Sequence, residues 1–151
     1  MAGERRAEAT QSAPLDPAVA AAFAHLGGMA EAVSELQIEL SEIPAPTGAE
    51  SERAGVMARW LQSTGCRVEI DGVGNVVGRR TGREPGPAVA LSAHLDTVFP
   101  AEQAVAVARP GDESPYQPGL RVPPGQLHGP GIADDAAGLA ALATALTLSP
   151  A

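Results

Sequence analysis

The sequence predicts an α/β fold, a sheet covered by helices in a three-layer arrangement, from three observations. Apolar residues recur at helical spacing up to Gly65, short β-branched segments follow as far as Ser92, and an Ala- and Leu-rich segment begins at Ala136. Helices before and after short strands are typical of a layered α/β sheet. We expect residues 1–15 to be disordered and residues 16–151 to form one domain.

Two helices are predicted in the first half of the chain. The first is marked by apolar residues at spacings of four, three, four and three: Met29, Val33, Leu36, Leu40 and Ile43. Pro44 ends it, because proline lacks the N–H that a helix needs. The second lies within residues 46–65, where Thr47 and Glu50 have capping-box spacing and Gly65 suits the position after the last turn.

The pattern then changes to short apolar and β-branched segments, which predict strands. Residues 66–71 and 74–80 should form two adjacent strands. The run from Ala88 to Ser92 shows no polar alternation, as expected of a third strand that is buried on both faces of a mainly parallel sheet.

The second half of the chain combines a long loop with a final helix. From Pro100 to Gly131 the sequence is rich in proline and glycine, which predicts a loop that carries a short edge strand at 104–109. From Ala136 to Leu148 the residues are apolar nearly all round, which predicts a buried helix.

Charge and composition exclude several classes of partner. Eighteen acidic and ten basic residues give a net charge of -8, which disfavours nucleic acid and anionic membrane surfaces. The one cysteine, Cys66, allows no internal disulfide and is expected to be a small buried side chain. Because the N-terminal residues lack the apolar run of a secretory signal, we expect a cytoplasmic protein.

His94 and Asp96 are the first candidate site residues, at the end of the third predicted strand. In extended backbone, residues two apart point to the same side, so Asp96 can hold one ring nitrogen of His94 while the other faces a metal. The alternative is that His94 merely ends the strand and Asp96 caps the following turn. The triplet alone favours that second interpretation.

Asp134 and Asp135 form the second candidate cluster, between a glycine-rich approach and the final helix. Acidic residues at a helix start often cap free N–H groups, which explains one aspartate more easily than two. A phosphate-binding loop is disfavoured, because the two carboxylates would stand where the phosphate belongs. His128 is an extra ligand, a proton shuttle or a solvent-facing loop residue, the last being favoured, and His25 receives no role.

Taken together, "SAHLDTVFP" (92–100) and "HGPGIADDAAGLAALATAL" (128–146) resemble the dinuclear zinc hydrolases that include aminoacylases, glutamate carboxypeptidases and tripeptide aminopeptidases. The segments "IPAPTGAESERAGVMARWLQSTG" and "GVGNVVGRRTG" resemble the opening of the same family, so the similarity spans about Met29 to Leu148. It implies the phosphorylase/hydrolase-like zinc peptidase core, of which residues 16–151 would be a truncated N-terminal part.

The resemblance also implies roles for single residues. His94 would bind one metal ion, Asp134 would bridge two, and Asp96 would clamp the His94 ring as the candidate catalytic side chain. The Asp134–Asp135 bond would be cis, with Asp135 serving the turn. The expected cofactor is zinc, with cobalt or manganese as alternatives that accept similar ligands.

The implied activity is hydrolysis of an amide or peptide bond by a metal-activated water, in a small peptide or an N-acyl amino acid. The family's later ligands, its general base and its lid domain have no counterpart in the chain, so we expect the activity to be incomplete. The alternative function is a non-enzymatic α/β binding module or an inactive fragment. In either case the final apolar helix predicts self-association.

Overall fold

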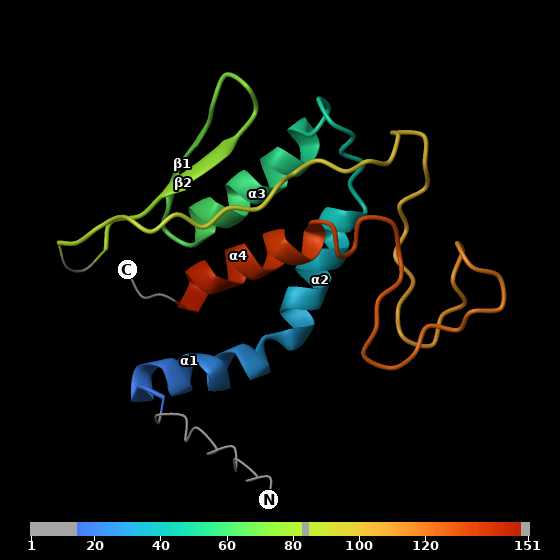
Figure 1. Ribbon diagram of the computed structural model, residues 1–151, viewed down its shortest axis with the longest axis horizontal. Coiled ribbons are helices and arrows are strands. Elements are labelled where there is room, and N and C mark those ends of the chain that lie inside the picture. The colour runs from blue at the N-terminus through green and yellow to red at the C-terminus, as the bar shows by residue number, and fades with distance from the viewer. Residues whose placement is uncertain (1–14, 83–84, 149–151) are drawn as a thin grey trace, which may run out of the picture.

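The computed structural model describes residues 15–82 and 85–148, which contain four helices and a two-stranded antiparallel sheet (Figure 1). An α/β class is therefore confirmed, whereas three layers around a larger sheet are not seen in the described residues. The expected disorder of residues 1–15 falls almost wholly outside them.

The first two helices follow one another with a bend between them (Figure 1). Helix α1 spans Pro17–Gly28; Asp16 caps it by accepting a 2.8 Å hydrogen bond from the Ala18 N–H. Helix α2 spans Ala30–Ser41 and buries Leu36, Ile38 and Leu40, while α1 buries no residue. The helix predicted from the apolar spacing after Met29 is thus confirmed, and it ends before Pro44.

Helix α3 (Ser51–Ser63) and the hairpin that follows it are also where the sequence predicts them. Gly65 adopts a φ of +81° directly after α3, a conformation that glycine reaches without steric cost. Strands β1 (Arg67–Ile70) and β2 (Val76–Arg79) pair antiparallel, with Ile70 opposite Val76 next to the turn. The Asp71 carboxylate accepts hydrogen bonds from the backbone of that turn, which fixes the register.

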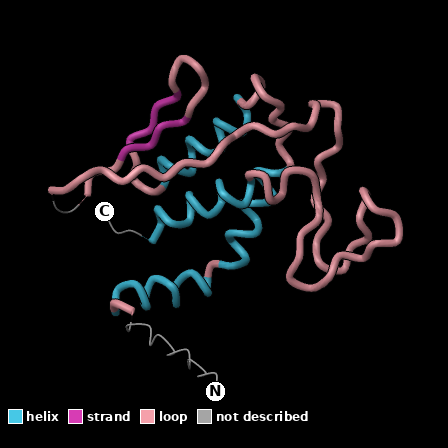
Figure 2. Tube along the Cα trace, in the orientation of Figure 1, coloured by secondary structure: helices cyan, strands magenta, loops and turns pink. Residues whose placement is uncertain are grey.

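Helix α4 (Ala136–Leu148) completes the hydrophobic core by packing along α2 and against α3 (Figure 2). The buried cluster joins the three helices: Leu36, Leu40, Val56, Met57, Ala136, Leu139, Ala140 and Ala143. The prediction of a helix over these residues is confirmed. The expectation that this helix is buried on all sides is wrong, because Ala141 and Ala145 are exposed.

The third predicted strand is not formed. Residues Ala88 to Ser92 carry no strand pairing and are exposed, with Val89 at 85% of its maximal accessible area. A strand is buried on both faces only when neighbouring strands and covering helices surround it, and no other described segment pairs with this one. The chain reaches the core only after this run, where Ala93 and Leu95 pack against the buried cluster.

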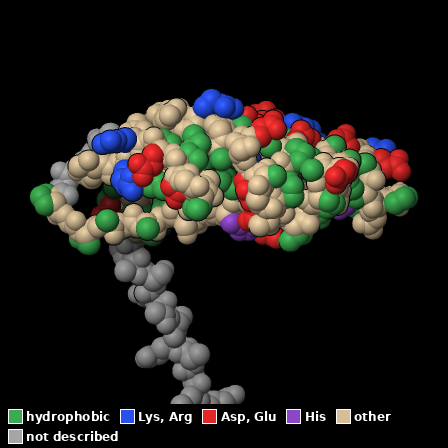
Figure 3. Space-filling view, turned by 90° about the horizontal axis from the view of Figure 1, so that it is seen from above, with side chains coloured by type: hydrophobic (Ala, Val, Ile, Leu, Met, Phe, Trp, Pro, Cys, Tyr) green, Lys and Arg blue, Asp and Glu red, His purple; other side chains and the backbone are tan. Residues whose placement is uncertain are grey.

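The long loop is confirmed, since residues 100–131 contain no helix and no regular strand. The edge strand expected at 104–109 is reduced to one antiparallel bridge between Ala108 and His128. Acidic and arginine side chains are spread over the face seen in Figure 3, interspersed with hydrophobic ones. Among the described residues, no helix has both the length and the apolar character needed to cross a membrane.

Candidate metal site

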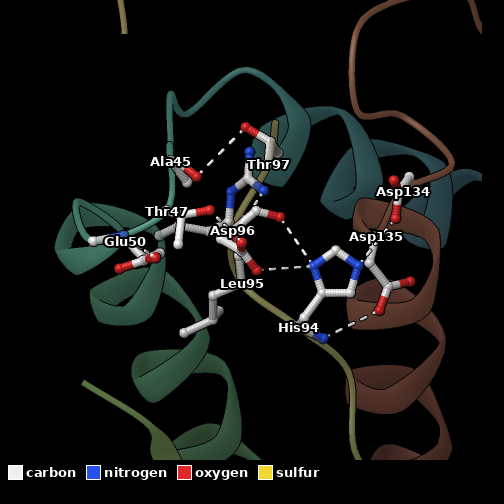
Figure 4. Close-up of polar contacts among 11 residues, drawn as sticks. Ala45, Thr47, Glu50, His94, Leu95, Asp96, Thr97, Asp134 and Asp135 are labelled. Atoms are coloured by element: carbon white, nitrogen blue, oxygen red, sulfur yellow. Dashed lines mark hydrogen bonds and ion pairs between the residues drawn. The ribbon is translucent and has the colours of Figure 1, made fainter. Parts of the chain in front are cut away.

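Three irregular segments meet at the N-terminal end of α4 (Figure 4). The first leads from α2 into α3, the second carries His94 and Asp96, and the third is the turn before α4. The first two are joined by a parallel bridge between Pro46 and Thr97, where the Thr97 N–H donates to the Ala45 carbonyl at 2.7 Å. Regular sheet pairing is absent from these described segments, so side-chain hydrogen bonds hold them in place.

Those side chains come from the helices. Arg53 of α3, only 1% exposed, donates to the Leu95 carbonyl at 2.9 Å and to the Ile43 carbonyl at 2.6 Å. From α2, the Gln37 amide donates to the Ile132 carbonyl and the buried Ser41 hydroxyl to the Pro130 carbonyl. The segment with His94 and the turn with Asp134 are thereby fixed to the same helical core.

His94 lies between the two acidic residues that the sequence analysis associates with it (Figure 4). Its Nε2 is 2.9 Å from Asp134 Oδ1, and its Nδ1 is 3.0 Å from the Asp96 carbonyl oxygen and 3.2 Å from Asp96 Oδ1. The structure thus brings together His94, Asp96 and Asp134. The catalytic and metal-binding roles of these side chains stay a prediction.

The contacts of Nδ1 determine what Nε2 can do. Both partners of Nδ1 are oxygen acceptors, so this nitrogen carries the proton in the neutral ring. Nε2 then presents a lone pair to the Asp134 carboxylate, which also has only lone pairs to offer. A second proton or a metal cation between the two atoms is required to make this contact attractive.

The protonated ring is stabilised in the absence of a metal. Desolvation lowers the pKa of His94, but the hydrogen bond to Asp134, the Asp96 carbonyl and the charges of Asp135 and Asp134 outweigh it, and the net shift is upward. The His94 side chain keeps half of its accessible area, so solvent reaches the site. Figure 3 shows histidine and acidic side chains together at the molecular surface.

Thr47 is a site residue that the sequence analysis assigned to a capping box instead. Its hydroxyl donates to Asp96 Oδ2 at 2.7 Å, and this bond is the main reason that the pKa of the Asp96 carboxyl is lowered. Glu50, not Thr47, stands at the N-cap of α3, and its carboxylate accepts from the Gly48 N–H. The capping-box prediction is therefore wrong, because the chain turns at Gly48 and the helix starts only at Ser51.

The turn before α4 has the features expected of it. The Asp134–Asp135 peptide bond is cis, and Gly131 adopts a φ of +72° where a side chain would crowd Thr97. Asp134 remains largely exposed, whereas the Asp135 carboxylate accepts a 3.2 Å hydrogen bond from the His94 N–H. Asp135 thus serves more than the turn, because it contacts the segment that carries the histidine.

The donors suit zinc in type but not in number. An imidazole nitrogen and a carboxylate oxygen are zinc ligands, and structural or catalytic sites use three or four protein ligands. Within residues 15–82 and 85–148, no group of three or more His, Cys, Asp or Glu side chains could hold a metal ion. The chain offers His94 and Asp134 as donors, with Asp96 supporting the ring from the other side.

The remaining histidines lie outside this cluster. A 2.6 Å hydrogen bond joins His128 Nδ1 to the Ser114 hydroxyl, and the His128 ring meets Tyr116 edge to face. It is half-buried, so the favoured interpretation as a solvent-facing residue is only partly right, and the structure gives it a role in holding the loop. His25 is exposed in the last turn of α1.

Comparison with known proteins agrees with this cluster. Residues 90–149 match the sequence model of peptidase family M20/M25/M40, a segment that contains His94, Asp96 and Asp134. Less than half of the chain lies in this match. The M20-family match confirms the resemblance on which the sequence analysis relied, for the N-terminal portion of such a hydrolase domain.

Three archaeal relatives share this region of the chain. Proteins of Pyrococcus abyssi and Pyrococcus horikoshii are 45% and 43% identical over 60 residues, 40% of this chain. A protein of Pyrococcus furiosus is 34% identical over 95 residues, 63% of this chain. All three are named as LysW-lysine/LysW-ornithine hydrolases. The aligned parts span only 17% to 24% of the relatives' own lengths.

Proposed function

We propose that residues 16–151 provide part of the metal site of an M20-family amide or peptide hydrolase. The observation that carries the proposal is the 2.9 Å approach of His94 Nε2 to the Asp134 carboxylate, with Nδ1 already committed to Asp96. Two lone pairs aimed at one point are what a cation requires. The match of residues 90–149 to the sequence model of that family supports the same assignment.

Each residue has a distinct part in this proposal. His94 Nε2 and Asp134 would hold zinc, with cobalt or manganese as alternatives, while Asp96 fixes the ring orientation and increases the basicity of the ligating nitrogen. When bound, the metal supplies an activated water for attack on an amide carbonyl. His94 and Asp134 are fewer than the three or four protein ligands that a zinc site uses, so we expect this chain alone to bind zinc weakly and not to turn over substrate.

The substrate class proposed is a small peptide or an N-acyl amino acid. The relatives' names describe hydrolysis of lysine or ornithine joined to LysW, which is a conjugate of an amino acid. We extend only the bond type to this chain, because the aligned region covers less than a quarter of those relatives. A cytoplasmic location belongs to the same proposal.

Calorimetric titration with zinc tests the metal site directly. The full chain should bind zinc weakly, and Asp134→Ala and His94→Ala should each abolish the signal because each removes one of two donors. Glu102→Gln is the matched control, an exposed acidic residue on the loop that should leave binding unchanged. Zinc binding that survives both Asp134→Ala and His94→Ala would contradict the assignment.

A non-enzymatic binding module is the second candidate, favoured by one observation. An open groove of about 1170 Å³ runs beside the site, and leucines of three segments line it: Leu61, Leu91, Leu95, Leu139, Leu142 and Leu146. A protein that used this groove instead of the metal cluster would keep its partner affinity in the Asp134→Ala variant, because Asp134, unlike His94, does not line the groove. A metal site would instead lose zinc binding with that change.

A further inference from the structure

The carboxylate of Asp135 lies where a helix-capping group would be expected, but its hydrogen bond goes elsewhere. Asp135 immediately precedes α4, so capping of the helix N–H groups is the ordinary role for its side chain. Within the described residues, the hydrogen bond that Asp135 Oδ2 accepts comes from the His94 N–H, 41 residues earlier in the chain. This carboxylate therefore connects the histidine segment to the helix.

Gly138 leaves the space that this carboxylate occupies. A Cβ atom added at Gly138 would lie 2.7 Å from the Asp135 carboxyl carbon and 2.8 Å from Oδ2, the oxygen that accepts the His94 bond. Residues three apart on a helix are neighbours, so the carboxylate rests directly over the glycine. Any side chain at position 138 would push the carboxylate away from His94.

We propose that Asp135 is a positioning residue that holds the His94 backbone against α4, and that Gly138 is required because it gives the carboxylate room. The bond to the His94 N–H and the His94 Nε2 contact with Asp134 come from adjacent residues of one turn. Asp135 thus fixes the backbone of the same histidine whose ring faces its neighbour. The inference deepens the proposed function, since it rests on His94 being the metal ligand.

Glycine substitution distinguishes this role from ordinary helix stability. Alanine has a higher helix propensity than glycine, so an unhindered Gly→Ala change inside a helix should raise Tm by about 2–4 °C in a chain of this size. Gly55 of α3 is the matched control, because its added Cβ would meet only Arg59 Nη1 at 3.7 Å. We expect Gly55→Ala to raise Tm and Gly138→Ala to lower it by about 2–6 °C.

A double-mutant cycle assigns the loss to the carboxylate. In an Asp135→Ala background the obstructing group is gone, so Gly138→Ala should raise Tm as Gly55→Ala does. Hydrogen exchange followed by NMR adds a local readout. The His94 amide should exchange several-fold faster in Gly138→Ala and in Asp135→Ala, and at nearly the normal rate in Asp135→Asn, which retains an acceptor oxygen.

Zinc titration connects the positioning role to the site. Loss of a supporting contact of a metal ligand typically weakens metal binding by 10- to 100-fold, and we expect about tenfold for Gly138→Ala, with Asp135→Asn close to the unmodified chain. A rise in Tm for Gly138→Ala together with unchanged His94 exchange would overturn the positioning role. Zinc binding that is indifferent to Asp134→Ala would instead overturn the proposed metal site and leave the Tm and exchange results standing.

Discussion

Replacement of Arg53 by methionine should destabilise the fold more than any other single charge removal in α3. The guanidinium is buried and donates to the Ile43 and Leu95 carbonyls, which joins the segment after α2 to the segment that carries His94. Methionine has a similar apolar length but no donor. Both carbonyls would therefore lose their partner at the place where the site is assembled.

The expected loss in the free energy of unfolding follows from these two hydrogen bonds and from the opposing cost of burying the guanidinium. A hydrogen bond from a charged donor contributes about 1.5–3 kcal/mol, so two such bonds contribute about 3–6 kcal/mol. Burial of the guanidinium opposes this, because desolvation lowers the pKa of Arg53 and its Nε has no partner among the described residues. We expect a net loss of about 2–4 kcal/mol in the free energy of unfolding for Arg53→Met.

Urea unfolding at neutral pH, followed by circular dichroism, measures this loss. Arg59→Met is the matched control, an exposed arginine on the same helix that should change the free energy of unfolding by less than about 0.5 kcal/mol. If Arg53→Met unfolded at the same urea concentration as Arg59→Met, the two carbonyl bonds would contribute no net stability, and the explanation of how the site segments are joined would be refuted.

Three further perturbations test other parts of the structure. Thr47→Val should raise the pKa of Asp96, measured by NMR titration, because the Thr47 hydroxyl is the main cause of its depression; Thr47→Ser should not. Asp71→Asn should lower the free energy of unfolding above pH 3.8, because the pKa of Asp71 is lowered in the fold, chiefly by its hydrogen bond with Asn75. The difference in the free energy of unfolding between this variant and the unmodified chain should shrink as the pH falls. A difference that does not change with pH would contradict this. Sedimentation at micromolar concentration should show self-association that Leu91→Glu reduces, whereas a mass of 15.2 kDa at every concentration would exclude it.

The elements that the sequence predicts correctly are those specified by neighbours along the chain. Apolar spacing placed α2, Gly65 marked the end of α3, and the short β-branched segments placed the hairpin. The apolar run after Ala136 placed α4. In each case the decisive interactions are within the element or one turn away, so periodicity and turn chemistry suffice.

The predictions that failed depend on partners distant in sequence. An apolar run such as Ala88 to Ser92 is typical of a buried strand, yet burial requires other strands beside it, and the described residues supply none. The burial of Arg53 could not be predicted from the sequence for the same reason. A charged residue on an amphipathic helix is expected to face solvent, and only the carbonyls of Ile43 and Leu95 explain its burial.

The candidate site combines both kinds of information. The two-residue spacing of His94 and Asp96 is local and predicted their contact, whereas the approach of Asp134 could be expected only from the resemblance of both motifs to one family. The contacts of Thr47 and Asp135 were not predicted, because each residue bonds to a partner more than forty positions away in the sequence. Motif spacing thus points to candidate ligands more readily than to the residues that hold them in place.

The way the site is held has a physical consequence for its precision. All of its segments are irregular, so apart from the bridge between Pro46 and Thr97 their positions depend on side-chain bonds. Three come from helices, Arg53 to Leu95, Gln37 to Ile132 and Ser41 to Pro130, and one comes from the turn before α4, Asp135 to His94. Each of these bonds ends on a backbone atom, which fixes the path of the chain rather than the orientation of one side chain. A metal ligand needs its donor atom placed within a few tenths of an ångström. The helices therefore act as the rigid support of the site, and substitutions in α2 or α3 that touch no metal ligand should still weaken metal binding.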